Sequence, residues 1–175
     1  EIFTGLVDED SRSIPKGVEK GFIVKEKGIN TGKSRYDFHF IDKYGYPFCR
    51  GRLFQNLEND EGQYDDVKEV FWATGACLFV RASIYHKYGG LDDDFFAHME
   101  EIDFCWRLKN LDYKIMYCPN SKIYHIGGGT LPKSSARKTY LNFRNNLSLL
   151  MKNLPDGKVF WTIFYRFFLD WIAAF

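Results

Sequence analysis

Acidic side chains gather at the start of one predicted helix, and their spacing divides them between two faces. The stretch from Met99 to Leu111 has a helical pattern. At 3.6 residues per turn, Glu101 heads a face that is otherwise apolar, formed by Phe104, Cys105 and Leu108. Glu100 and Asp103 lie on another face, where Arg107 is spaced for an i,i+4 ion pair with Asp103. An inward carboxylate is suited to chemistry, although acids also favour a helix N-terminus through the macrodipole alone.

A histidine near a glycine run is the second candidate. His125 ends a short predicted strand and is followed, after one residue, by Gly127, Gly128 and Gly129. Because glycines let the backbone approach a ligand closely, this arrangement favours a ligand site over a purely structural histidine.

Short elements must position these side chains. A buried strand is predicted over Val70 to Arg81 with a break at Gly75, followed by a helix that Ser83 caps and Gly89-Gly90 ends. Two further strands, Tyr113 to Cys118 and Lys122 to His125, are predicted with Pro119 ending the first.

The flanking regions differ from each other in pattern. Residues 16–35 are predicted to form a loop or short strands, and residues 36–66 are predicted to form a long, structured, aromatic loop. Ser135 to Leu154 and residues 159–175 are predicted to be helices, the second strongly apolar.

Four motifs occur in order: a small-Gly-small strand at Ala73 to Cys77, a Gly-Gly-Leu-Asp turn, an acidic pair with a trailing Asp and Arg, and a Tyr-His-x-Gly-Gly-Gly loop. In this order and spacing the sequence resembles family two glycosyltransferases of the GT-A fold, most of all bacterial rhamnosyl- and galactofuranosyl-transferase-like members. The resemblance covers roughly residues 37 to 155.

The resemblance implies an α/β fold, with a mostly parallel twisted sheet flanked by helices. Residues 1–155 would be a partial GT-A domain, a Rossmann-like nucleotide-diphospho-sugar transferase whose N-terminal nucleotide-binding strands are largely missing. Residues 156–175 would be an apolar C-terminal helical extension, truncated at its end.

The resemblance also implies an inverting transfer of sugar from a nucleotide-sugar donor to a glycan or lipid-linked acceptor, as in cell-surface polysaccharide synthesis. Glu101 takes the position of the general base, with Glu where the family more often has Asp. A divalent cation, Mg²⁺ or Mn²⁺, would offset the charge of the leaving diphosphate. His125 matches a metal-binding histidine of some members. Asp8 and Asp10 are either the family's Asp-x-Asp metal motif or acids of an ordinary loop.

The segment after the glycines has two interpretations. Gly127, Gly128, Gly129, Lys133 and Arg137 would form a loop that contacts the donor phosphates, since cations suit phosphate oxygens. Otherwise, Lys133 to Arg144 is a solvated helix face. Aromatic rings between Tyr36 and Tyr64 would help to form the acceptor surface.

Composition bounds the partners. The net charge is +1, which excludes a global electrostatic footprint for nucleic acid. The four cysteines lack zinc-site spacing and are expected to be reduced, which suits a cytoplasmic protein.

In the last helix, Trp161, Tyr165, Arg166 and Trp171 fit an interfacial helix at the inner face of a membrane, or the start of a membrane segment. The helix could also be a core helix that packs on a missing part.

A second functional hypothesis stays open. A GT-A remnant without its nucleotide-binding half could be a non-catalytic carbohydrate-binding or scaffold fragment, in which Glu in place of Asp marks lost activity.

Overall fold

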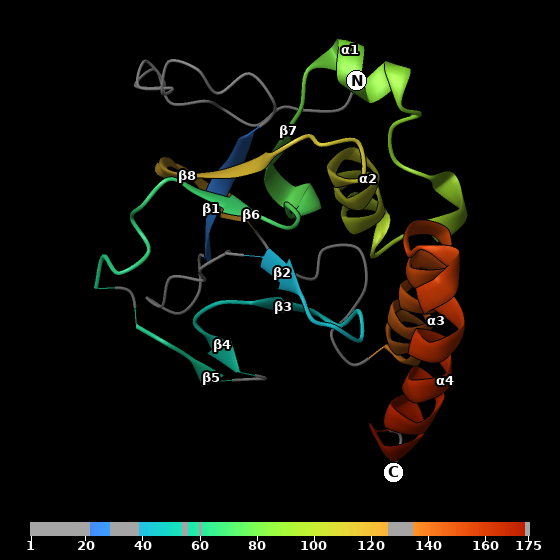
Figure 1. Ribbon diagram of the computed structural model, residues 1–175. Helices are drawn as coiled ribbons and strands as arrows, with labels where there is room; N and C mark the ends of the chain where they lie inside the picture. The colour runs from blue at the N-terminus through green and yellow to red at the C-terminus, as the bar shows by residue number, and fades with distance from the viewer. Residues whose placement is uncertain (1–21, 29–38, 54–55, 60, 126–134, 174–175) are drawn as a thin grey trace.

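The computed structural model describes residues 22–28, 39–53, 56–59, 61–125 and 135–173 (Figure 1). The predicted strand Ile2 to Val7 lies outside them. In the described part, helices and small sheets combine in an α/β arrangement, as expected.

The central sheet has four strands in the order β6-β8-β1-β7. These are β1 (Phe22–Gly28), β6 (Lys68–Val70), β7 (Leu78–Phe79) and β8 (Ile115–His125). Only the β1–β8 pair is parallel, while β7 and β6 each pair antiparallel at the two edges. The described sheet is therefore mixed, where a mostly parallel sheet was expected. The predicted break at Gly75 separates β6 from β7, which lie at opposite edges of the sheet.

Pro119 does not end a strand, so the prediction of two strands here was wrong. β8 continues through Pro119, and the register against β1 shifts at this point: Val24 pairs with Cys118, and Lys25 pairs with Lys122. Residues 119–121 thus form an irregularity within one strand. A proline cannot donate a ladder hydrogen bond, and a bulge is where a strand tolerates it.

The predicted aromatic loop over residues 36–66 contains two short hairpins. One pairs β2 (His39–Ile41) with β3 (Pro47–Cys49), and the other pairs β4 (Arg52–Leu53) with β5 (Asn56–Leu57). The Asp42 carboxylate accepts hydrogen bonds from two backbone N–H groups of the first turn, at 2.9 Å each. Local side-chain hydrogen bonding of this kind gives a polar segment a fixed turn.

Helix α1 (Ala82–Lys87) begins earlier than the sequence indicated. Arg81 is its N-cap residue without a side-chain bond, and Ser83 lies inside the helix, so the predicted Ser83 cap was wrong. The predicted end is confirmed, because Gly89 and Gly90 follow with φ of +78° and +59°, a conformation that glycine adopts without steric cost.

Helix α2 (Glu100–Lys109) confirms the predicted acidic helix and lies between the sheet and α3 (Figure 1). Its buried apolar residues belong to the main core, with Val70, Ile115 and Tyr117 of the sheet. Those helix residues are Ile102, Phe104, Cys105, Trp106 and Leu108.

Helices α3 (Ala136–Asn153) and α4 (Asp156–Ala173) lie side by side at one edge of the molecule (Figure 1). Leu154, in an extended conformation before Pro155, separates them. The buried face of α3 carries Leu141, Leu149 and Leu150, and with them three asparagines: Asn145, Asn146 and Asn153.

The burial pattern of α4 is the reverse of that of an ordinary surface helix. Its one buried residue is Arg166, at 1% exposure, while the aromatic side chains face outward. The Arg166 guanidinium lies 3.7 Å from the centre of the Tyr46 ring, donates to the backbone oxygen of Tyr44 and to Asn146 Oδ1, and pairs with Asp170 at 3.1 Å. Arg166 is therefore not an interfacial residue, contrary to expectation.

Tyr46 completes this attachment. Its hydroxyl donates to Asp170, and burial together with that hydrogen bond raises the pKa of Tyr46 to about 12. The α4 helix is thus held to α3 and to the 42–46 turn by buried charged groups and only in part by apolar packing.

Replacing Arg166 should detach α4. Arg166→Met keeps apolar bulk but leaves Asp170 and the Tyr44 oxygen without their partner, so we expect a loss of about 3 kcal/mol in the free energy of unfolding. Urea unfolding measures this loss, and faster amide hydrogen exchange confined to α4 would localise it. Lys158→Met, at an exposed position of the same helix, is the control. Equal stability of the two variants would contradict the assignment.

Candidate functional site

Glu101 lies where the first turn of α2 meets the segment that connects β6 to β7. A Cβ placed on Gly75 would lie 3.9 Å from Glu101 Cβ, so Glu101 closes the space beside the Gly75 backbone. Glu101 Oε2 is buried and has no hydrogen-bond partner among the described residues. The structure therefore brings together two of the sequence motifs, the Ala73 to Cys77 segment and the acidic pair.

This environment alters the acidity of Glu101. Burial raises the pKa of its carboxyl from 4.5 to about 7, and the adjacent Glu100 charge adds to the effect. Backbone hydrogen bonds at Glu101 and Gly75 and the charge of the nearby His39 act in the opposite direction. A carboxyl that titrates near neutral pH can accept a proton and release it again under ordinary conditions.

Two more polar side chains flank the site. Glu100 Oε2 and His98 Nε2 are buried and also lack a hydrogen-bond partner among the described residues. Burial and the charge of Lys138 lower the pKa of His98, while Glu100 opposes them. Unpartnered buried polar atoms are costly, so each of these three calls for an explanation, and a catalytic role or a bound water or ion is one.

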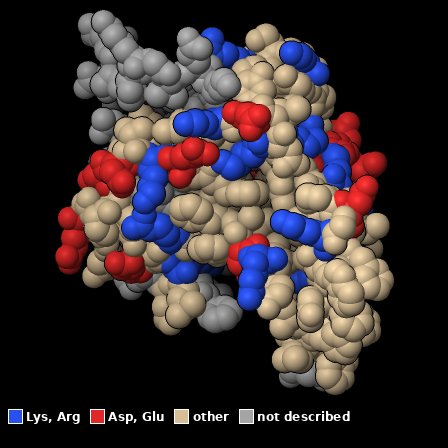
Figure 2. All heavy atoms as spheres, viewed as in Figure 1, with Lys and Arg blue, Asp and Glu red and all other residues tan. Residues whose placement is uncertain are grey.

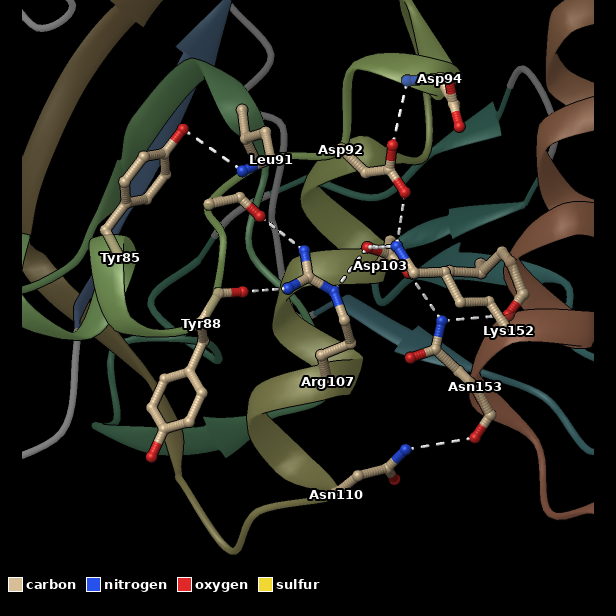
Figure 3. Close-up of polar contacts among 12 residues, drawn as sticks. Tyr85, Tyr88, Leu91, Asp92, Asp94, Asp103, Arg107, Asn110, Lys152 and Asn153 are labelled. Atoms are coloured by element: carbon tan, nitrogen blue, oxygen red, sulfur yellow. Dashed lines mark hydrogen bonds and ion pairs between the residues drawn. The ribbon is translucent and has the colours of Figure 1, made fainter.

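Asp103 and Arg107 form the predicted i,i+4 ion pair at 2.7 Å (Figure 3). Asp103 is completely buried, so this face of α2 is ion-paired but not solvated. Its carboxylate also accepts from Lys152 Nζ at 2.9 Å and from Asn153 Nδ2 at 2.8 Å. The pair has a structural role and lies on a different face of α2 from Glu101.

Arg107 extends this network to the Gly-Gly turn. Its two terminal nitrogens donate to the backbone oxygens of Tyr88 and Gly90 (Figure 3). Asp92, which follows the turn, caps the short 3₁₀ segment η3 (Asp93–Phe95) and pairs with Lys152 at 2.6 Å. The turn, α2 and α3 are therefore joined through a few charged side chains.

The segment between η3 and α2 has an unusual backbone. Phe96, His98 and Met99 have φ of 62°, 70° and 75°, and none of them is glycine. Phe96 is 67% exposed, and the Arg137 guanidinium lies 5.1 Å from the centre of its ring. Arg137 is in the first turn of α3, so in the described structure it contacts the segment that leads to Glu101.

The candidate metal ligands are only partly described. His125 is the last residue of β8 and pairs with Gly28, as the predicted strand end requires, but Asp8 and Asp10 lie outside the described residues. Within the described ranges, no three His, Cys, Asp or Glu side chains gather as metal ligands would. Gly127, Gly128, Gly129 and Lys133 also lie outside them.

The cysteines form no disulfide among the described residues. Cys105 lies next to Glu101 in the core, and burial raises the pKa of its thiol to about 12, which makes it unreactive.

Sequence reasoning missed several buried polar residues outside the four motifs. Asn145, Asn146 and Asn153 are buried on α3, and His39 is buried beside Trp72 with ring centres 3.8 Å apart. The signal was present in α3, because the helical period that lines up its buried leucines also places these asparagines inward.

The charged surface agrees with the composition. Figure 2 shows acidic and basic groups interspersed on the viewed face, with an uncharged surface where α4 lies. None of the described helices is both long enough and apolar enough to cross a bilayer.

Comparison with known proteins indicates a class for part of the chain. The sequence is similar to glycosyltransferases. It is 30% identical over 103 residues to the low-salt glycan biosynthesis hexosyltransferase Agl10 of Haloferax volcanii, covering 57% of this chain and 34% of that protein. It is 34% identical over 79 residues to the N-acetylglucosaminyl-diphospho-decaprenol L-rhamnosyltransferase of Mycobacterium tuberculosis, covering 45% of this chain and 26% of that protein, with the same result in two strains. The chain thus spans about a third or less of the length of these curated relatives.

A different similarity covers the start of the chain. Residues 1–66 match the family described as the NrdJ homologue C-terminal domain. This match ends before Gly75 and Glu101, and about half of its residues lie outside the described structure. It therefore does not include Gly75, Glu101 or the motifs around them, although His39, whose charge acts on Glu101, lies within it.

The raised pKa of Glu101 predicts a pH-dependent stability. Between pH 4.5 and about 7 the folded protein holds a proton at Glu101 that the unfolded chain has released, so the free energy of unfolding falls as pH rises through this window. Gln does not titrate. The free energy of unfolding of Glu101→Gln, relative to that of wild type, should thus rise by about 3 kcal/mol from pH 4 to pH 8.

Urea unfolding of both proteins at pH 4, 6 and 8 measures this growth. Glu61→Gln, at an exposed position, is the control for the loss of one carboxyl group. A pH-independent difference for Glu101→Gln would mean that the carboxyl is solvated.

Proposed function

We propose that this chain is part of an inverting glycosyltransferase that moves a sugar from a nucleotide-sugar donor to a glycan or lipid-linked acceptor. The observation that carries the proposal is the buried Glu101 carboxyl, held against Gly75 and titrating near neutral pH. The relatives are named as a glycan-biosynthesis hexosyltransferase and a rhamnosyltransferase of a diphospho-decaprenol-linked sugar, which supports this class of reaction and acceptor.

In the proposed reaction, an acceptor hydroxyl attacks the anomeric carbon of the donor sugar. A new glycosidic bond forms as the bond to the nucleoside diphosphate breaks, and the diphosphate leaves with the electron pair. The hydroxyl proton passes to Glu101, whose ionised form is populated at neutral pH. Because this is one in-line displacement, the configuration at the anomeric carbon is inverted.

A divalent cation, Mg²⁺ or Mn²⁺, is also proposed, on the resemblance to family two glycosyltransferases. When bound, such a cation would offset negative charge on the diphosphate. His125, at the end of β8, would be its ligand with Asp8 and Asp10. The described residues alone do not form a metal site, so the base chemistry of Glu101 is derived without it. Arg137 and Lys133, with the three glycines, would contact the phosphates.

The outward face of α4 is proposed to lie on the inner face of a membrane, with the protein in the cytoplasm. Phe160, Phe167 and Trp171 are each at least 60% exposed, and Arg166 and Asp170 are turned inward. Contiguous exposed apolar surface of this kind marks an interaction site, and Trp, Tyr and Phe suit the headgroup level. A lipid-linked acceptor would be reached from such a position.

Loss of the Glu101 carboxylate should abolish turnover. In the full-length protein, Glu101→Gln should lower kcat by about a hundredfold or more, with little change in donor affinity, because only proton transfer is lost. Glu61→Gln serves as the exposed control, and a chelator added to the wild-type assay tests the cation. Near wild-type turnover of Glu101→Gln would refute the assignment. Donor or glycan binding by a wild type that transfers no sugar would favour the non-catalytic alternative.

Serine substitutions on the aromatic face should weaken membrane binding. We expect the full-length protein to sediment with anionic vesicles at low salt, and the triple variant Phe160→Ser, Phe164→Ser, Phe167→Ser to remain in the supernatant. Leu111→Ser removes an exposed apolar side chain elsewhere and should sediment as wild type does. Wild type that stays in the supernatant while self-associating through this face would contradict the membrane assignment.

A further inference from the structure

The segment that leads into α2 has a strained backbone, with positive φ at Phe96, His98 and Met99. Phe96 has φ of 62° and ψ of −56°, and the Ala97 N–H donates to the Phe95 oxygen at 2.7 Å. This is a γ-turn with positive φ at a bulky residue, which is rare and strained. His98 and Met99 follow with positive φ, and Met99 gives α2 its N-cap without a side-chain hydrogen bond.

Such a backbone persists only where its surroundings hold it. Two adjacent side chains of α3, Asn145 and Arg144, donate hydrogen bonds to this segment. Asn145 is 1% exposed, and its Nδ2 lies 2.9, 2.8 and 2.7 Å from the backbone oxygens of Phe95, Ala97 and His98. Two amide hydrogens thus serve three carbonyl groups, and these carbonyls belong to the strained residues or their neighbours.

The neighbouring arginine orients that amide. Arg144 Nε donates to Asn145 Oδ1 at 2.8 Å, which turns the Nδ2 group toward the carbonyls. Arg144 also donates to the oxygens of Asp94 at 2.9 Å and Phe95 at 3.2 Å. We call Asn145 and Arg144 the α3 clamp.

We propose that the α3 clamp is a positioning device for the site: Asn145, held by Arg144, fixes the strained 95–99 segment so that α2 begins with Glu101 directed into the buried contact with Gly75. The inference rests on the proposed role of Glu101 as base. Asn145 acts through the backbone and touches none of the reacting atoms.

The consequence can be measured at Glu101. If the 95–99 segment relaxes to ordinary backbone angles, the first turn of α2 rotates or frays and the Glu101 carboxyl gains water. Among the described residues, the charged and titratable groups that act on Glu101 are Glu100 and Cys105 on α2 and His39 on β2, and no substitution below changes them. A change in the titration of Glu101 then reports its position.

The experiment compares two adjacent asparagines in the full-length protein. Asn145→Ala removes the clamp. Asn146→Ala is the matched control, since this equally buried amide donates to the Gly45 oxygen at 2.8 Å and accepts from Arg166, away from α2. Both variants lose stability, so stability alone does not separate them.

We expect Asn145→Ala to lower kcat by about ten- to a hundredfold with little change in donor KM, a range typical of a displaced catalytic group. The acid limb of its kcat–pH profile should move to lower pH. Asn146→Ala should keep the wild-type acid limb and most of its kcat. Unchanged kcat and acid limb in Asn145→Ala, or equal changes in both variants, would overturn the proposal.

Two further measurements cover the other outcomes. Arg144→Ala removes only part of the clamp and should shift the titration of Glu101 in the same direction as Asn145→Ala does. It replaces Asn145→Ala in the experiment if that variant does not fold. Carboxyl NMR titration of Glu101 in each variant needs no substrate, so it tests the clamp even if wild type transfers no sugar. A Glu101 titration that is the same in Arg144→Ala and wild type would count against the clamp.

Discussion

The buried carboxylate of Asp103 is the interaction on which the arrangement of this structure depends. A fully buried charge is tolerated only with partners, and Asp103 has three: Arg107 on its own helix, and Lys152 and Asn153 on α3. Arg107 in turn holds the oxygens of Tyr88 and Gly90. The rotation of α2 about its axis is thereby fixed against both neighbours, and Glu101 is directed toward Gly75.

Helix α3 acts on the site through amides as well as charges. Asn145 holds the backbone that precedes α2, Asn146 holds the first hairpin turn and Arg166, and Asn153 holds Asp103. Each amide reaches a different element, and each is on the inward face of one helix. A helix that looks like an ordinary amphipathic element thus connects the first hairpin, the segment before α2, α2 itself and α4.

Much of this could be predicted from the sequence, for reasons that lie in particular residues. The helical period placed Glu101 inward and paired Asp103 with Arg107, because both statements depend only on positions along one helix. Pro119 misled the prediction because a strand tolerates proline at a bulge, and the bulge depends on pairing with β1. Arg166 misled it because whether a charge is buried is decided by Tyr46 and Asp170, which are 120 and 4 residues away along the chain. The three asparagines share the period of the buried leucines, but their partners, which include backbone oxygens of residues 45, 95, 97 and 98 and the Asp103 carboxylate, lie far away along the chain.

The parallel pairing at the centre of the sheet has a consequence for the order of folding. Strand β1 meets β8 between residues as far apart as Phe22 and Met116, whereas α3 and α4 contact each other across a two-residue connection. Contacts of large sequence separation form slowly, because a long loop must close before they are made. During synthesis, β7 and β6 emerge well before β8 and have no complete sheet to join. We therefore expect the sheet to keep an edge open to other chains until β8 is inserted between β6 and β1, and the helical hairpin, which follows β8 in the chain, to form from local contacts once it has been synthesised.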